Sequence, residues 1–187
     1  MPILEREPDT FPESLLDEGG SAFNALRPWW ALYSLPRHEK QLVRKLRLAG
    51  LAHYCPFVSK RYRSPAGRIR VSHVPLFAGY VFLCGDGEER GRALATNCVS
   101  RVLEVPCAAD LVEDLRRIRR LVCSNAALTV ESRLKPGSRV RVRSGAFAGY
   151  EGTILQRQGQ TRLIVSVRFL QQGASVELDD CQLEPLA

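Results

Sequence analysis

The hydrophobic pattern changes once along the chain, at Pro136-Gly137. Before this point, between residues 29 and 123, short apolar runs alternate with stretches whose apolar residues recur every three or four positions. After it the period is two, and glycines separate the runs. The first pattern is typical of strands mixed with amphipathic helices, and the second of short antiparallel strands. We therefore predict an α+β region followed by a small all-β barrel.

The first predicted helix includes Pro36, which suits a first helical turn because its missing N–H would have no partner there. One face of this helix is apolar, another is basic, and Gly50 ends it. The apolar face consists of Leu42, Leu46 and Ala49. The basic face consists of Lys40, Arg44 and Arg47.

A second long helix is predicted where apolar residues recur at helical spacing between residues 111 and 122, and a short helix over Glu88–Ala95. We expect strands at Trp30–Tyr33, Tyr80–Leu83 and Ser100–Val105. Two basic segments flank a tetrapeptide with turn-forming composition, and together they predict a β-hairpin. The segments are Lys60–Arg63 and Arg68–Val71, around Ser64–Gly67.

The domain organisation follows from these patterns and from composition. Residues 1–28 contain four prolines, a Gly-Gly pair and no sustained apolar period, which predicts a flexible acidic extension. Residues 29–123 form the first domain, 124–135 a linker, and 136–187 the β domain. Valines alternate with arginines around Val140, and such β-branched alternation favours a permanent barrel over refolding into helices.

Charge is distributed unevenly over the 187 residues. The net charge is +7, but residues 1–28 carry 2 basic and 6 acidic side chains, whereas residues 29–123 carry 17 basic and 8 acidic ones. The first domain therefore has an electrostatic reason to approach a polyanion such as nucleic acid. The alternative is that these lysines and arginines only keep the domain soluble.

Several classes of protein are disfavoured. The longest run without charged residues is Val71–Gly85, which is shorter than the roughly 20 residues of a membrane-spanning helix. The start of the chain is acidic and does not resemble a secretory signal. The six cysteines include no C-x-x-C pair, so buried reduced thiols in a cytoplasmic protein are expected. The three histidines are scattered and no nucleophile or phosphate-loop motif occurs, so we expect no enzyme, cofactor or metal.

Two motifs carry a resemblance to a known family. Residues 75–82 read PLFAGYVF and, with Trp29–Leu32 and a helix opening that contains Glu39, resemble the amino-terminal domain of NusG-family transcription elongation factors. Residues 137–163 resemble a KOW motif, the barrel module that ends such proteins. The resemblance covers residues 29–187 in order. It implies an α/β sandwich with an antiparallel sheet, the NGN domain, followed by an SH3-like KOW barrel.

The resemblance also implies a function. A monomeric factor would bind the clamp helices of the largest RNA polymerase subunit and non-template or upstream DNA. It would suppress pausing or termination and raise processivity. Ala78 replaces a proline that is usual in the family, and Trp30 a tyrosine, which favours an operon-specific paralogue similar to RfaH or the capsule-locus antiterminators. Two alternatives stay open: a general NusG factor that couples polymerase to Rho or the ribosome, and a ribosome- or RNA-binding KOW protein.

The resemblance and the basic patterns together assign candidate residues. RNA polymerase docking is expected at Tyr33, Phe77, Tyr80 and Phe82, with Arg90 and Arg92 as a second contact. For each aromatic ring, packing in the core is the alternative. DNA contacts are expected at Arg37, Lys40 and Arg44 and at the hairpin residues Arg61, Arg63, Arg68 and Arg70. In the barrel, Phe147 is the expected contact for a small-subunit ribosomal protein or Rho.

Overall fold

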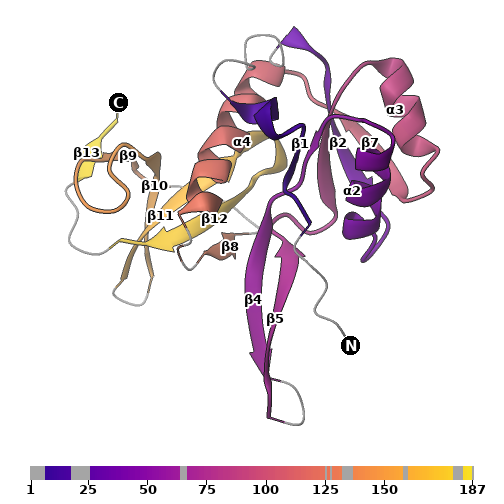
Figure 1. Cartoon of the computed structure of the whole chain (residues 1–187). Coiled ribbons are helices and arrows are strands. Elements are labelled where there is room, and N and C mark those ends of the chain that lie inside the picture. The colour runs from indigo at the N-terminus through magenta and orange to yellow at the C-terminus, as the bar shows by residue number, and fades with distance from the viewer. Residues whose placement is uncertain are drawn as a thin grey trace. The chain divides into compact units, whose positions relative to one another are not determined.

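The structure is a computed structural model that describes residues 7–17, 26–63, 67–124, 126, 128–131, 137–157, 160–178 and 183–186. The chain divides into two compact units, residues 1–112 and 113–187. Helix α4 (Ala108–Cys123) crosses this division, which therefore falls inside the helix and not after it, where the sequence placed the end of the first domain. Figure 1 labels most elements of both units.

The amino-terminal unit is built on a five-stranded antiparallel sheet with the order β1-β3-β6-β2-β7. The strands are β1 (Thr10–Phe11), β2 (Trp29–Ser34), β3 (His53–Tyr54), β6 (Tyr80–Cys84) and β7 (Val99–Glu104). The strand β6 lies at the centre, and its neighbours Val81 and Phe82, which point to opposite faces, are both fully buried. Both faces of the central strand are therefore covered.

Helices α2 (Glu39–Leu48) and α3 (Gly87–Leu94) pack on one face of this sheet, where Ala93 of α3 belongs to the same buried cluster as α2. Leu42, Val43 and Leu46 of α2 form one buried cluster with Leu32 of β2 and Val81 of β6. Helix α3 begins with a capping box, in which Asp86 accepts from the N–H of Glu89 and Glu89 accepts from the N–H of Asp86. The mixed α+β class predicted for this region is confirmed.

The start of α2 differs from the prediction. The helix begins at Glu39, and Pro36 lies in the preceding turn instead of the first helical turn. The reason is Arg37, whose φ of 64° is left-handed and incompatible with a right-handed helix. At the other end Gly50, with φ of 68°, follows the helix as predicted.

Part of the predicted flexible extension is instead packed on the unit. β1 pairs with β3, and Leu15 and Leu16 of the 3₁₀ helix η1 (Glu13–Leu16) are buried. The prediction is wrong for this segment because a two-residue strand and one leucine pair leave no detectable hydrophobic period. Residues 1–6 and 18–25 lie outside the described part of the chain.

The predicted basic hairpin is present. β4 (Phe57–Arg63) and β5 (Ile69–Pro75) pair antiparallel, with Arg61 opposite Val71 and Tyr62 opposite Arg70. The two strands form a sheet of their own and extend as a ribbon away from the five-stranded sheet (Figure 1). Residues 64–66, which belong to the predicted turn, are outside the described part.

The carboxyl-terminal unit contains a six-stranded antiparallel sheet with the order β13-β9-β10-β11-β12-β8. Its strands are β8 (Thr129–Glu131), β9 (Arg139–Val142), β10 (Glu151–Arg157), β11 (Gln160–Val167), β12 (Gln172–Glu177) and β13 (Leu183–Pro185), with a 3₁₀ helix η2 (Arg168–Leu170) after β11. The small β domain is confirmed, with Val140 and Val142 buried between exposed arginines. β8 lies within the predicted linker and pairs with β12, a long-range pairing that a three-residue run does not reveal.

Candidate protein and nucleic-acid interfaces

Two of the predicted docking rings meet at one end of the amino-terminal sheet. Tyr33 of β2 lies opposite Tyr80 of β6 in the strand register, so both side chains share one face. Their rings pack edge to face with centroids 5.1 Å apart. Because their neighbours Leu32 and Val81 belong to the cluster under α2, the tyrosines point to the face opposite that helix. Tyr33 is 40% exposed and Tyr80 is half-buried.

The other two predicted rings belong to the core. Phe77 and Phe82 are fully buried and pack edge to face at 6.3 Å. Neither ring offers surface to a partner in this structure, because Phe82 lies in the covered strand β6 and Phe77 is buried against Phe82. Phe77 and Phe82 are therefore core residues, which was the alternative to the predicted role in docking RNA polymerase.

Gly79 and Glu39 hold the tyrosine pair in place. The backbone N–H of Gly79 donates to Glu39 Oε1 at 2.9 Å, and its carbonyl accepts from the N–H of Ser34 at 2.7 Å. Gly79 has a φ of 82°, and the Tyr33 ring lies against its Cα face. The sequence placed both residues in the family motif but assigned neither a role. The signal available in the sequence was a glycine, Gly79, two residues after Phe77 and directly before Tyr80.

The predicted second polymerase contact lies on α3. The guanidinium of Arg90 stacks over the Trp30 ring at 4.8 Å, and Trp30 Nε1 donates to the Gly85 carbonyl at 2.9 Å. Arg92 is exposed and donates to the Ala49 carbonyl. Because α3 packs on the face with α2, these arginines are not brought together with Tyr33 and Tyr80.

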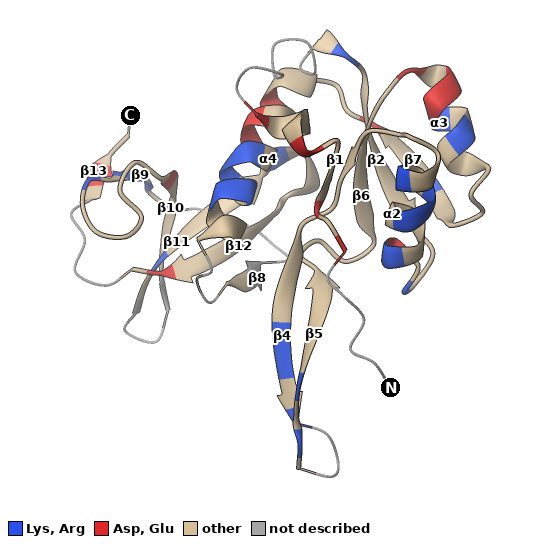
Figure 2. Cartoon of the chain, viewed as in Figure 1, with Lys and Arg blue, Asp and Glu red and all other residues tan. Residues whose placement is uncertain are grey.

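The cations predicted on the first helix are separated by the turn at Arg37. Arg37 is exposed in that turn, Lys40 is half-buried, and Arg44 is exposed on α2. Arg44 is also paired with Glu7, a partner that the sequence did not suggest because it comes from the predicted extension. Figure 2 shows the lysines and arginines of α2 gathered along the helix.

The hairpin carries the other predicted DNA-binding cations. Arg61, Arg63, Arg68 and Arg70 are all exposed. Residues 57–75 contain no aspartate or glutamate, and Figure 2 marks lysine and arginine positions in blue along the ribbon. By register, Arg61 and Arg63 share one face of the ribbon, while Tyr62 and Arg70 share the other. The ribbon therefore presents positive charge on both faces, which complements a polyanion.

Phe147 lies in the loop between Gly145 and Gly149, which have φ of 85° and 84°. Its ring packs edge to face on Tyr150 at 5.7 Å, and it is half-buried. Tyr150 is covered in turn by the Arg120 guanidinium at 5.7 Å, and burial raises the pKa of its hydroxyl. Phe147 is thus anchored on one side and accessible on the other.

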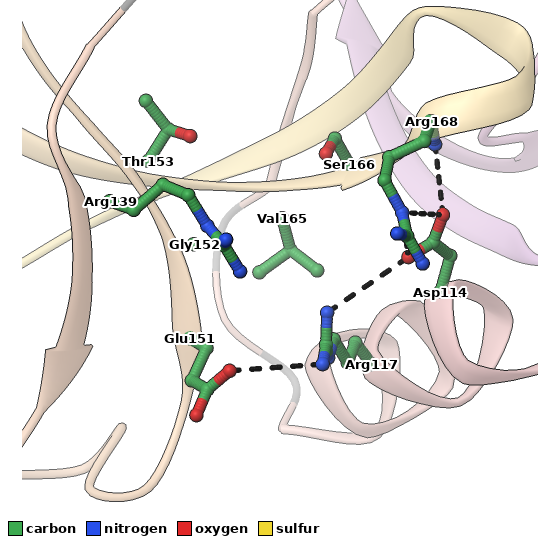
Figure 3. Close-up of a pocket in the computed structure, with 9 residues that line it drawn as sticks. All are labelled: Asp114, Arg117, Arg139, Glu151, Gly152, Thr153, Val165, Ser166 and Arg168. Carbon is green, nitrogen blue, oxygen red and sulfur yellow. Dashed lines mark hydrogen bonds and ion pairs between the residues drawn. The ribbon is translucent and has the colours of Figure 1, made fainter. Parts of the chain in front are cut away.

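The carboxyl-terminal unit also contains a polar pocket of about 350 Å³, between α4 and the strands β9 to β11 (Figure 3). Buried Asp114 accepts from the N–H of Arg168 at 2.9 Å and from its Nε at 3.1 Å. Arg117 pairs with Glu151 at 3.7 Å, and the hydrogen bond from Arg141 lowers the pKa of Glu151. The sequence singled out none of these pairs. Most charges in this pocket are matched by a neighbour of opposite sign, so the arrangement stabilises the unit.

Within the described ranges, no three His, Cys, Asp or Glu side chains are grouped so that they could hold a metal ion. Across the same residues, no helix combines the length and apolar composition that crossing a membrane requires.

Comparison with known proteins gives three matches. The model of the NusG family, described as transcription termination factor nusG, matches residues 27–129. The KOW motif model matches residues 136–168. The transcription termination/antitermination protein NusG of Thermus thermophilus is 26% identical over 179 residues, which cover 83% of this chain and 96% of that protein. The first match covers more than half of the chain and includes the β2 and β6 strands that carry the tyrosine pair. This chain belongs to the NusG family and carries a KOW motif after its NusG domain.

Proposed function

We propose that this chain is a transcription elongation and antitermination factor that binds RNA polymerase and raises its processivity at particular operons. The observation that carries the proposal is the packed pair of Tyr33, which is exposed, and Tyr80, which is half-buried, at the end of the sheet. Its relative from Thermus thermophilus is named for termination and antitermination of transcription. The proposed activity is binding alone, and it makes or breaks no covalent bond.

The tyrosine pair is the proposed docking surface for the clamp helices of the largest polymerase subunit. A buried tyrosine contributes roughly 150–250 Å² of contact area, and its hydroxyl can keep a polar partner at the rim. Edge-to-face packing and the Gly79 support restrict the rings before binding, so little side-chain entropy is lost on docking.

The basic hairpin is the proposed DNA contact. Its exposed arginines lie on a ribbon without acidic residues, and the ribbon extends away from the sheet that carries the tyrosines. Contacts of this kind bind phosphates and position the chain without reading sequence. Arg37, in the turn before α2, and Lys40 and Arg44, on α2, are proposed as a second group of DNA-binding cations.

An operon-specific role is favoured over a general one by the departures from the family pattern. Ala78 is exposed next to Gly79 and Tyr80, so the substitution lies at the proposed docking surface. Trp30 holds Arg90 by stacking. A general NusG factor remains the competing function, and activity on templates without the native operon leader would favour it.

A second binding function is proposed for the KOW domain, carried by the partly accessible ring of Phe147. A ring on a glycine-bounded loop suits a protein partner, and a small-subunit ribosomal protein and Rho are the two candidates. The Phe147→Ala variant should lose that partner in a pull-down and keep polymerase binding.

The decisive experiment measures binding to RNA polymerase elongation complexes and transcript length. Wild type is compared with Tyr33→Ala/Tyr80→Ala and with Leu94→Ala, an apolar truncation on α3 at a side chain that is 43% exposed, close to the 40% of Tyr33. We expect wild type and Leu94→Ala to bind and lengthen transcripts, and the double variant to lose most binding while its thermal unfolding stays cooperative. The single variant Tyr33→Ser serves if the double variant unfolds. If wild type binds no elongation complex, the proposal fails and an RNA-binding KOW protein takes its place.

A further inference from the structure

The segment of residues 7–17, here called the acidic strap, carries four acidic residues and no lysine or arginine. It lies before residue 27, where the match to the NusG family begins. The strap nevertheless packs on the amino-terminal unit. Its role is therefore one that the match to the family does not explain.

Three interactions attach the strap to the sheet edge. β1 pairs with β3, with Phe11 opposite His53, and those two rings stack at 6.0 Å. The N–H of Cys55 donates to the Asp9 carbonyl at 2.7 Å. Leu15 and Leu16 are buried, which adds an apolar anchor after the strand. The attachment is therefore concentrated between residues 9 and 16.

Glu7 precedes β1 in the chain, and its side chain contacts α2. Its Oε1 accepts from Arg44 Nε at 2.5 Å, and its Oε2 accepts from Arg47 Nη2 at 3.0 Å. The Glu7 side chain is only 10% exposed, whereas Arg44 is 44% exposed. One carboxylate thus bridges two guanidinium groups three residues apart on one helical face.

We propose that the acidic strap is an intramolecular competitor of nucleic acid, in which Glu7 occupies the guanidinium groups of Arg44 and Arg47 that would otherwise bind phosphates. This inference rests on the proposed function, which places Arg44 among the DNA-binding cations. A carboxylate and a phosphate use the same donors of arginine, so both cannot hold them at once.

The position of Glu7 makes the competition reversible. Glu7 precedes β1, while the strand pairing and the buried leucines follow it, so the carboxylate can leave α2 without loss of the anchor. The guanidinium groups are partly exposed, so phosphate can approach them as Glu7 departs. Nucleic acids that bind weakly are then kept from Arg44 and Arg47. A nucleic acid that another contact already holds close to the chain displaces Glu7.

The first test measures binding of a labelled mixed-sequence duplex DNA to the full chain across a salt titration. Glu7→Gln removes the bridging charge, and Glu88→Gln removes an equal charge from an exposed position on α3. We expect Glu7→Gln to bind several-fold more tightly, with a salt slope steeper by about 0.9 for each newly engaged phosphate. Glu88→Gln should show a smaller change and an unaltered slope. If affinity and salt slope change equally in the two variants, the effect of Glu7 comes from net charge alone, and the proposal is overturned.

The second test separates this inference from the proposed function. Arg44→Gln/Arg47→Gln should weaken DNA binding, and adding Glu7→Gln to it should have no more effect than Glu88→Gln has in wild type, because the competed groups are gone. If the double variant binds DNA more weakly but Glu7→Gln alone has no effect, the role of Arg44 and Arg47 in DNA binding is supported. The proposal that Glu7 competes with DNA is then overturned. If neither the double variant nor Glu7→Gln changes binding, Arg44 and Arg47 have no role in DNA binding, and both the competition and the assignment of Arg44 fail.

Discussion

Gly79 lies directly against the ring of Tyr33: a Cβ added to Gly79 would be 2.8 Å from Cε2 of Tyr33. The same glycine has a φ of 82°, which residues with a side chain rarely adopt. One residue therefore meets two demands, a left-handed turn before β6 and space for an exposed ring. This explains in physical terms why a glycine stands between Ala78 and Tyr80.

Gly79→Ala should displace the Tyr33 ring and strain the turn. We expect a loss of stability of about 1–3 kcal/mol and weaker binding to elongation complexes. Thermal unfolding and a polymerase binding titration measure the two effects. Gly91→Ala is the matched control, because that glycine lies in α3 with nothing within 4 Å of an added Cβ. It should stabilise the unit by roughly 0.5–1 kcal/mol. Unchanged polymerase binding in Gly79→Ala would argue against the tyrosine pair as the docking surface.

The hairpin cations should contribute to DNA binding through phosphates. For Arg61→Gln/Arg63→Gln we expect weaker binding at every sequence and a salt slope shallower by about 0.9 per lost phosphate contact on duplex DNA. The control Arg139→Gln/Arg143→Gln removes the same charge from exposed positions of the KOW domain. A fluorescence titration at several salt concentrations measures the slope. An equal loss in both double variants would mean that the ribbon contributes only net charge.

His53 should make the fold sensitive to mild acid. Burial under β1 lowers the pKa of His53 below its ordinary value of 6.5, although its Nδ1 lies 2.8 Å from the Leu51 carbonyl. As the pH falls through 6.5, the unfolded chain takes up this proton first, so stability decreases until the pH passes the folded pKa. The loss reaches about 1.4 kcal/mol for each unit between the two pKa values.

Urea unfolding between about pH 7.5 and 5.5 tests this dependence. Wild type should lose stability over that range, and His53→Gln should lose less, because its side chain does not titrate. If the two proteins show the same slope against pH, another group controls the acid sensitivity.

Gly152 should be essential to the KOW sheet. A Cβ at this position would lie 2.3 Å from the Ile164 carbonyl oxygen and 2.9 Å from Leu163 Cδ1, so β10 and β11 would have to separate. We expect Gly152→Ala to destabilise the carboxyl-terminal unit by about 1–3 kcal/mol or more. Both tryptophans of the chain are in β2, so their fluorescence reports the amino-terminal unit alone. The midpoint temperature of a thermal transition followed by circular dichroism should fall, while the midpoint followed by tryptophan fluorescence should stay the same. A lower midpoint in both signals would indicate that the units unfold together.

The elements that were predicted correctly are those that depend on interactions between residues close together in the chain. A change of period from 3.6 to two separated the α+β region from the β domain, and the turn-forming residues between two basic runs predicted the hairpin. The four hairpin arginines are exposed, as basic residues on a two-stranded ribbon must be, because the ribbon has no core to enter. The family motifs also came from sequence, since they are short and contiguous.

Which aromatic residues are available for binding depends on packing between distant segments, which the sequence pattern does not record. The four predicted rings, Tyr33, Phe77, Tyr80 and Phe82, look alike in sequence. In the structure Phe82 is buried within β6 and Phe77 is buried against it, whereas the two tyrosines pair at the end of the sheet. The acidic strap was hidden for a related reason. The partners of its two-residue strand and of Glu7 lie between 37 and 44 positions further along the chain, and no local period records a partner at that separation.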